Sequence, residues 1–176
     1  MKEKGILKYG LFELKDGSMS DFFITTGKFD DGEGNSLMSD YYSDKIINDI
    51  GVGTFDFIYG PAYKGIPIAA SIAQKMYDKY RINKRYGYDK KEEKKYGPKN
   101  ESTFIGDLRE NDRVLIVDDV ITSGKTKIEQ MNKLENLVKE VKVVSVLVLV
   151  DRCKDKRILE KYGIKLYSVL DYKELF

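Results

Sequence analysis

Beyond about residue 36, short continuous apolar runs, typical of buried strands, alternate with hydrophobic positions spaced three or four residues apart, which are typical of helices. The near-continuous apolar run 142–151 is typical of a central parallel strand. This alternation predicts an α/β fold with a mostly parallel central sheet and helices on both faces. The predicted strands are 55–59, 85–88, 113–119, 142–151 and 164–170, and the predicted helices are 37–50, 66–80, 128–137 and 154–162.

Two segments depart from this alternation. Residues 1–35 mix short apolar pieces with several glycines, which predicts an irregular flap or a small appended sheet. Residues 89–103 are polar and rich in lysine, so they form either a solvated loop or a lid over a site. Because no repeat and no linker is visible, we expect one domain over residues 1–176.

Composition narrows the chemistry. The 176 residues include 31 basic and 29 acidic ones, and a net charge of +2 gives no reason to expect nucleic-acid binding. No apolar run is long enough to cross a bilayer, and the charged N-terminal residues lack the apolar stretch of a signal peptide. Cys153 is the single cysteine, so no internal disulfide can form, and we expect a cytoplasmic protein. The absence of histidine excludes Ser-His-Asp and Cys-His catalysis, and a metal would be oxygen-bound, most plausibly Mg²⁺.

The run Val114–Thr126 carries the strongest chemical pattern. An apolar strand ends in Asp118 and Asp119, and a turn of small residues then leads into a helix. The turn resembles the end of a Walker A loop, but Asp119 stands where that pattern needs glycine. Backbone N–H groups of 122–126 and the start of the following helix would instead hold a monophosphate. Carboxylates cannot hold phosphate themselves, but they suit ribose hydroxyls or a magnesium ion.

The pattern therefore predicts a site for a phosphorylated sugar at the carboxyl edge of the sheet, where open α/β sheets bind ligands. The alternative is an acidic strand end that only caps a helix. The run resembles the phosphoribosyl-diphosphate (PRPP) motif of the type I phosphoribosyltransferases. The resemblance implies that Asp118 and Asp119 contact the ribose hydroxyls, and indirectly the Mg²⁺ that accompanies PRPP. It also implies that the 5′-phosphate is bound by Val120, Ile121, Thr122, Ser123, Gly124, Lys125 and Thr126.

Three further segments resemble the orotate phosphoribosyltransferases. Residues 59–67 resemble their diphosphate loop, with Tyr63 and Lys64 as contacts, although alone they read as an ordinary turn. Residues 89–97 resemble the mobile catalytic loop. Asp151-Arg152 resembles a pair whose arginine meets the orotate carboxylate, a role that suits the planar guanidinium; without the resemblance, Arg152 reads as a surface ion-pair partner. In the mobile loop, the resemblance makes Lys94 the catalytic lysine and Lys90 and Lys91 diphosphate contacts.

Residues 12–17 and 20–23 resemble the N-terminal hood that covers the base in this family, with Phe22 and Phe23 as substrate contacts; their alternative is an amphipathic edge strand. The chain departs from the family pattern at Met19, Tyr96 and Pro98. The resemblance covers roughly Phe12 to Leu170.

Taken together, the resemblance implies transfer of the phosphoribosyl group from PRPP to orotate, which gives orotidine 5′-monophosphate and diphosphate in pyrimidine biosynthesis. It also implies Mg²⁺ as cofactor and a homodimer in which the loop lysine reaches the neighbouring subunit. Two alternatives stay open: a phosphoribosyltransferase for another base, such as a purine, and a PRPP-binding regulator without turnover.

Overall fold

The computed structural model describes residues 7–13, 19–25, 27, 29–90, 104–153 and 157–171. The chain divides into two compact units, Met1–Met38 and Ser39–Phe176. The larger unit contains a six-stranded sheet, and the smaller one contains a two-stranded sheet.

The six-stranded sheet has the order β5-β4-β3-β6-β7-β8. All neighbouring strands are parallel except β4 and β5, which are antiparallel. The predicted mostly parallel sheet is therefore confirmed. The strands are β3 (Phe57–Tyr59), β4 (Arg85–Asp89), β5 (Phe104–Ile105), β6 (Arg113–Ile121), β7 (Lys142–Asp151) and β8 (Lys165–Asp171).

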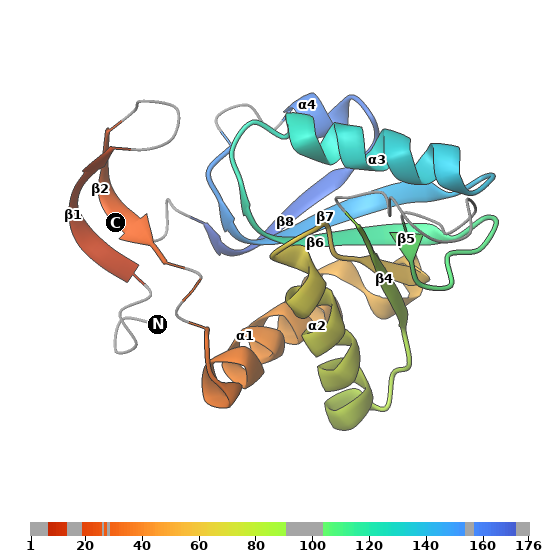
Figure 1. Cartoon of the computed structure of the whole chain (residues 1–176), viewed down its shortest axis with the longest axis horizontal. Helices are drawn as coiled ribbons and strands as arrows, with labels where there is room; N and C mark the ends of the chain where they lie inside the picture. Colours follow the sequence, from red (N-terminus) through yellow and green to blue (C-terminus); the bar gives the residue numbers. More distant parts are fainter. Residues whose placement is uncertain are drawn as a thin grey trace, which may run out of the picture. The chain divides into compact units, whose positions relative to one another are not determined.

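Helices cover both faces of this sheet (Figure 1). Helix α2 (Gly65–Tyr80) and residues 39–45 of α1 (Gly32–Lys45), which continues into a π-helical turn (Ile46–Ile50), lie on one face. Helices α3 (Lys125–Leu137) and α4 (Arg157–Glu160) lie on the other. This three-layer arrangement follows from the right-handed crossovers that join parallel strands.

The core lies around β6 and β7. All four apolar residues from Val114 to Val117 are fully buried, as are Val146, Leu147 and Val148 of the neighbouring strand. Apolar side chains on both faces of a strand are what a central strand between two helical layers requires. Within the described part of the chain, no helix has the length and apolar content that a bilayer crossing needs.

The structure differs from the predicted elements at a few ends. Strand β6 continues past the two aspartates, because Val120 and Ile121 pair with Val150 and Asp151 of β7. Helix α4 is described only over Arg157–Glu160, and residues 154–156 of the predicted helix lie outside the described part. The short antiparallel edge strand β5 had no counterpart among the predicted strands.

The smaller unit contains the antiparallel pair β1 (Leu7–Glu13) and β2 (Met19–Ile24). The rings of Phe12 and Phe23 lie 5.5 Å apart between these strands. The N-terminal segment is thus a small sheet, one of the two forms that its composition predicted.

Candidate active site

The carboxyl ends of β3 and β6 form a topological switch point. The two strands are parallel neighbours, with Tyr59 beside Ile116. From β3 the chain moves outward to β4, whereas from β6 it moves in the opposite direction to β7. The loops that follow two such strands separate and leave a crevice, which is where open α/β sheets bind ligands. The loops here are 60–64 and 122–124, the two segments in which the sequence predicts phosphate contacts.

Asp118 and Asp119 lie near the end of β6, and each is paired with a lysine. The Asp118 carboxylate accepts a hydrogen bond from Lys127 Nζ of α3 and another from the Asp119 backbone N–H at 2.9 Å. Asp119 accepts from Lys64 Nζ at 2.6 Å. Both carboxylates are largely buried, with 17% and 15% of the side chain exposed, respectively.

Burial dominates the electrostatics of Asp118. Loss of solvation raises the pKa of this carboxyl above its usual value, and the Lys127 ammonium opposes that rise. Behind the strand, the fully buried Tyr42 donates its hydroxyl to the Asp118 carbonyl oxygen at 2.7 Å. Burial and the two nearby aspartates raise the pKa of Tyr42, so its hydroxyl stays protonated and remains a donor.

The turn after β6 leads directly into α3. Thr122 and Ser123 are exposed, and the buried Gly124 begins the helix with φ +74°. A Cβ at Gly124 would lie 2.8 Å from Ile158 Cγ2, so the backbone approaches α4 as only glycine allows. Lys125 and Thr126, in the first turn of α3, are exposed. Backbone N–H groups at the start of a helix provide a binding position for an anion.

The turn after β3 contacts both neighbouring strand ends. Tyr63 and Lys64 are exposed, and the Ala62–Tyr63 peptide bond is cis. The Lys64 ammonium reaches Asp119 across the switch point, while the Ala62 N–H donates to Asp89 Oδ1 at 3.0 Å. This turn is therefore tied to β6 on one side and to β4 on the other.

The end of β4 joins the same edge. Asp89 also accepts from Lys133 Nζ of α3 at 2.9 Å. Burial acts to raise the pKa of Asp89, but the hydrogen bonds from Lys133 and the Ala62 N–H outweigh it and lower the pKa overall. The carboxylate therefore stays ionised, and Lys90 follows it directly in the chain at the end of β4.

Arg152 follows β7 at the same edge. Its backbone N–H donates to the Ile121 carbonyl at 2.9 Å, which places it next to the start of the 122–124 turn. Ile121 is only 3% exposed and belongs to the hydrophobic core, so its side chain does not line the predicted site. Val120, one residue earlier, is partly buried.

The other predicted site residues lie in the smaller unit or outside the described residues. Phe22 and Phe23 lie in β2 of the smaller unit, where Phe22 pairs with Tyr9 and the Phe23 side chain is 40% exposed. Met19 begins the same strand. The remaining positions lie outside the described residues and stay predictions: Lys91, Lys94, Tyr96 and Pro98.

The structure adds Lys127, which the sequence analysis missed. Its side chain is only 4% exposed and lies on the face of α3 that also buries Met131 and Leu134. The spacing of four and then three residues was available in the sequence. A lysine at a core-facing helical position needs a buried countercharge, and Asp118 precedes Lys127 by nine residues, so the sequence could have suggested this pair.

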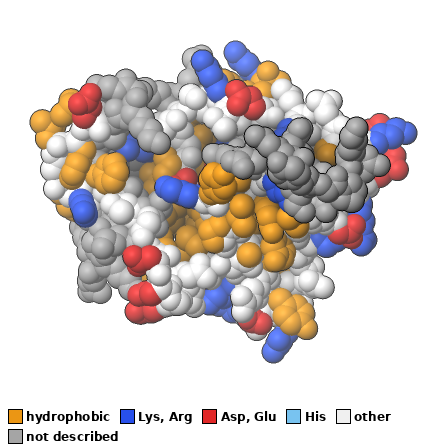
Figure 2. Space-filling model, viewed as in Figure 1, with side chains coloured by type: hydrophobic (Ala, Val, Ile, Leu, Met, Phe, Trp, Pro, Cys, Tyr) orange, Lys and Arg blue, Asp and Glu red, His pale blue; other side chains and the backbone are white. Residues whose placement is uncertain are grey.

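Charged side chains on the face drawn in Figure 2 are dispersed. Its blue and red side chains lie mainly around the rim, with hydrophobic side chains gathered nearer the middle. The described charges on that face form no large area of one sign, in keeping with the balanced composition.

Comparison with known proteins places this site in a family. The profile of the family described as "Phosphoribosyl transferase domain" matches residues 36–171, which include both loops and all six strands of the larger sheet. An orotate phosphoribosyltransferase of Clostridium acetobutylicum is 36% identical over 184 residues, covering 99% of this chain and 80% of that protein. One from Bifidobacterium animalis subsp. lactis is 32% identical over 188 residues, with the same coverage.

A solved structure supports the same family. The crystal structure of orotate phosphoribosyltransferase from Francisella tularensis matches with a TM-score of 0.84 and 32% sequence identity, and the match covers 99% of this chain and 84% of that one. Since identity above 30% extends over nearly the whole chain in both sequence and structure, the chain belongs to the orotate phosphoribosyltransferase family.

Proposed function

We propose that this chain transfers the 5-phosphoribosyl group from PRPP to orotate, which gives orotidine 5′-monophosphate and diphosphate in pyrimidine biosynthesis. The observation that carries the proposal is the switch point itself. An acid pair lies near the end of β6, an anion-binding helix start follows that strand, and a lysine-bearing turn follows β3. The Lys64–Asp119 ion pair joins the turn to the acid pair. A donor with a phosphate at one end, a diol in the middle and a diphosphate at the other matches that order.

Each part of PRPP then has its own contacts. The 5′-phosphate accepts hydrogen bonds from the backbone N–H groups of residues 122–126, where the start of the helix favours negative charge. The ribose hydroxyls donate to Asp118 and Asp119. The diphosphate lies toward Tyr63 and Lys64, with Lys90 and Lys91 closing from the lysine-rich segment.

The acid pair also fits Mg²⁺ that arrives with the donor. Among the described residues, no group of three or more acidic or thiol ligands gathers into a metal cage. Magnesium typically uses one or two carboxylates and completes its shell with substrate phosphates and water. Asp118 and Asp119 are such carboxylates, and the bound ion would neutralise charge on the departing diphosphate.

The protein's own part in the reaction is mainly electrostatic. The bond from the ribose carbon to diphosphate breaks as the orotate nitrogen approaches, so negative charge grows on the leaving group. Lys64 and the loop lysines, with Lys94 foremost, stabilise that charge. Closure of the 89–103 segment excludes water and suppresses hydrolysis of PRPP.

Arg152 supports orotate as the acceptor. A guanidinium presents paired donors that match a planar carboxylate, and orotate carries one whereas purine bases do not. Its position, one residue beyond the β7 partner of Ile121, lies at the crevice edge. Phe22 and Phe23 of the hood complete the base site in this proposal.

The assembly follows the family pattern. We take the chain as one phosphoribosyltransferase domain, in which residues 1–35 form the hood and residues 89–103 the catalytic loop. It acts as a cytoplasmic homodimer, with the loop lysine shared across the interface.

A base-selection assay tests the proposal. The chain is incubated with PRPP and Mg²⁺, together with orotate, hypoxanthine or uracil, and loss of base is followed by absorbance. Turnover with orotate alone is the expected result. Turnover only with hypoxanthine would favour the purine alternative, and PRPP binding without turnover of any base would favour a regulator.

A further inference from the structure

Lys127 is a buried cation in a position that normally holds an apolar side chain. It lies on α3, and only 4% of its side chain is exposed. Met131 and Leu134, four and seven residues later, are buried on the same face of the helix. A lysine taken out of water at such a position requires a close countercharge.

The countercharge is Asp118. Lys127 Nζ donates to Asp118 Oδ2, and the other carboxylate oxygen, Oδ1, accepts the Asp119 backbone N–H at 2.9 Å. The Asp118 carbonyl is fixed separately by the Tyr42 hydroxyl at 2.7 Å. Each carboxylate oxygen can accept more than one hydrogen bond, so a carboxylate held at both oxygens still has acceptor capacity for ribose hydroxyls.

The two acids differ in how their lysines can respond to a ligand. Lys64, which pairs with Asp119, has 64% of its side chain exposed, so a diphosphate in solution can reach its ammonium group. Lys127 is enclosed by the core face of α3 and has no comparable exposure. PRPP is a polyanion, so the ammonium group of Lys127 beside Asp118 reduces the repulsion that an isolated carboxylate would exert on PRPP.

We propose that Lys127 is a positioning residue for PRPP binding: it fixes the Asp118 carboxylate toward the ribose hydroxyls and cancels its charge from the buried side. The inference rests on the proposed function, because it needs Asp118 to contact the donor. Lys127 itself acts through Asp118.

A double-mutant cycle tests this role. PRPP affinity is measured by calorimetry for the full chain, Lys127→Met, Asp118→Asn and the double variant. Lys127→Met is expected to weaken PRPP binding by about tenfold or more, the usual range for partners that orient a binding group. In the Asp118→Asn background the same change is expected to cost less than about threefold, because the two residues act as one unit. Unchanged affinity in Lys127→Met, or an equal loss in both backgrounds, would overturn the proposal.

Kinetics separate positioning from a general structural effect. Lys127→Met is expected to raise the KM for PRPP and leave the KM for orotate within about twofold, whereas a loosened fold would raise both. Lys127→Gln, which keeps a donor near Asp118, is expected to recover part of the PRPP affinity. Should Lys127→Met fail to fold, Lys127→Gln replaces it in the cycle. A smaller loss of PRPP affinity that disappears in the Asp118→Asn background is then expected, and an equal loss in both backgrounds would overturn the proposal.

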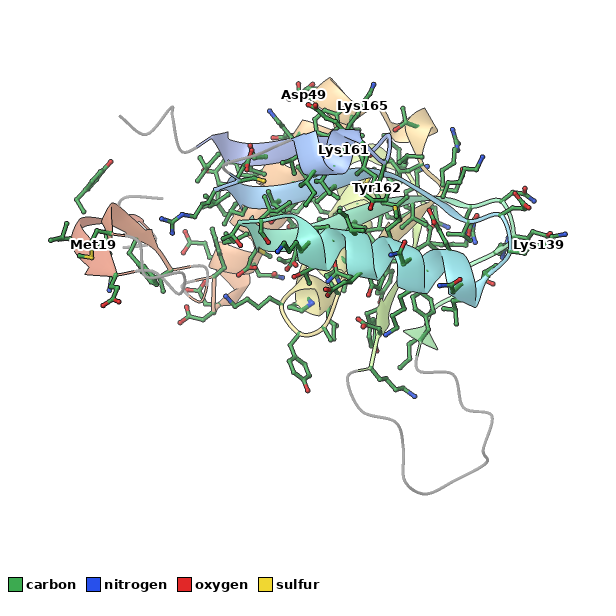
Figure 3. The ribbon with its side chains drawn as sticks, turned by 90° about the horizontal axis from the view of Figure 1, so that it is seen from above. Met19, Asp49, Lys139, Lys161, Tyr162 and Lys165 are labelled. Atoms are coloured by element: carbon green, nitrogen blue, oxygen red, sulfur yellow. The ribbon has the colours of Figure 1, made fainter. Side chains whose placement is uncertain are left out.

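Lys139→Met is the matched control. Lys139 lies between α3 and β7, at the edge of the sheet away from the crevice, and 78% of its side chain is exposed (Figure 3). The Lys139→Met variant is expected to bind PRPP with the affinity of the unaltered chain. A loss of PRPP affinity equal to that of Lys127→Met would contradict a role specific to Lys127. If the unaltered chain binds PRPP but does not turn over orotate, the proposed function fails while the affinity cycle still decides the role of Lys127.

Discussion

Lys64 and Asp119, which are 55 residues apart in the chain, form an ion pair of 2.6 Å between the turn after β3 and the end of β6. The pair therefore ties the turn after β3 to the end of β6 at the switch point. Because the Lys64 side chain is 64% exposed, its charge is available to a ligand that enters between them.

Replacing Lys64 is expected to affect the ligand more than the fold. Lys64→Met should raise the KM for PRPP about tenfold, since one charge-assisted contact to the diphosphate is lost. The free energy of unfolding should fall by no more than about 1 kcal/mol, because the Lys64 end of the pair is exposed and water can solvate Asp119 in its place. Steady-state kinetics and denaturant unfolding measure the two effects. A large loss of stability with an unchanged KM would show that the pair is structural.

Gly124 is expected to be required for the backbone of the 122–124 turn. Gly124→Ala should destabilise the chain by about 2–4 kcal/mol, because it combines a left-handed conformation with a Cβ placed 2.8 Å from Ile158. Gly163→Ala is the matched control: its φ is also positive, at +70°, but no atom lies within 4 Å of the added Cβ. In denaturant unfolding, the control should lose only the free energy that the left-handed backbone conformation costs an alanine, about 1–2 kcal/mol. Equal losses in both variants would rule out the predicted contact with α4.

Lys94 is the residue that we expect to carry most of the loop's catalytic effect. Lys94→Ala should lower kcat by about 10²- to 10³-fold, the usual loss when one stabilising donor for transition-state charge is removed. PRPP affinity should stay close to that of the unaltered chain. Lys95→Ala, the adjacent lysine, serves as the control. Turnover that is unchanged in Lys94→Ala would remove this residue from the catalytic role.

The Asp56–Arg113 pair predicts a pH dependence of stability away from the site. Hydrogen bonds from the Arg113 guanidinium lower the pKa of Asp56 to about 2. A carboxyl whose pKa is lower in the folded state contributes stability above its unfolded pKa of about 3.9 and loses that contribution as the pH falls toward 2. Since the side chains are 34% and 45% exposed, the contribution should stay below about 1 kcal/mol.

The comparison of the unaltered chain with Asp56→Asn measures this contribution. The difference in free energy of unfolding should be present near pH 6 and shrink as the pH falls from about 4 to about 2. A difference that grows toward low pH would contradict the assigned direction of the pKa shift.

Most of the larger sheet could be predicted because its strands are continuous apolar runs and its helices have regular spacing. The anion-binding turn was also visible, since Asp118 through Thr126 are consecutive residues. The end of β6 was not, because Val120 and Ile121 become strand residues only through pairing with β7.

Long-range contacts explain the rest of what the sequence did not reveal. The Lys64–Asp119 and Ala62–Asp89 contacts join residues that are far apart in the chain, so no local sequence pattern predicts them. The spacing between Lys127 and Met131 could have predicted that Lys127 is buried. The sequence could not establish Asp118 as its partner, because that contact depends on how α3 packs on the sheet. The roles of Lys91 and Lys94 rest on family resemblance alone.

Calorimetric titration of PRPP, in the presence of Mg²⁺, into the unaltered chain and into Asp118→Asn/Asp119→Asn tests the central assignment most directly. Both variant side chains keep their size but lose their charge, and Asp118→Asn leaves the buried Lys127 without its countercharge, so far-UV circular dichroism must first verify that the double variant is folded. Saturable binding by the unaltered chain and no detectable binding by the folded double variant is the predicted result. Retained PRPP affinity in that variant would mean that the ribose does not bind at the end of β6.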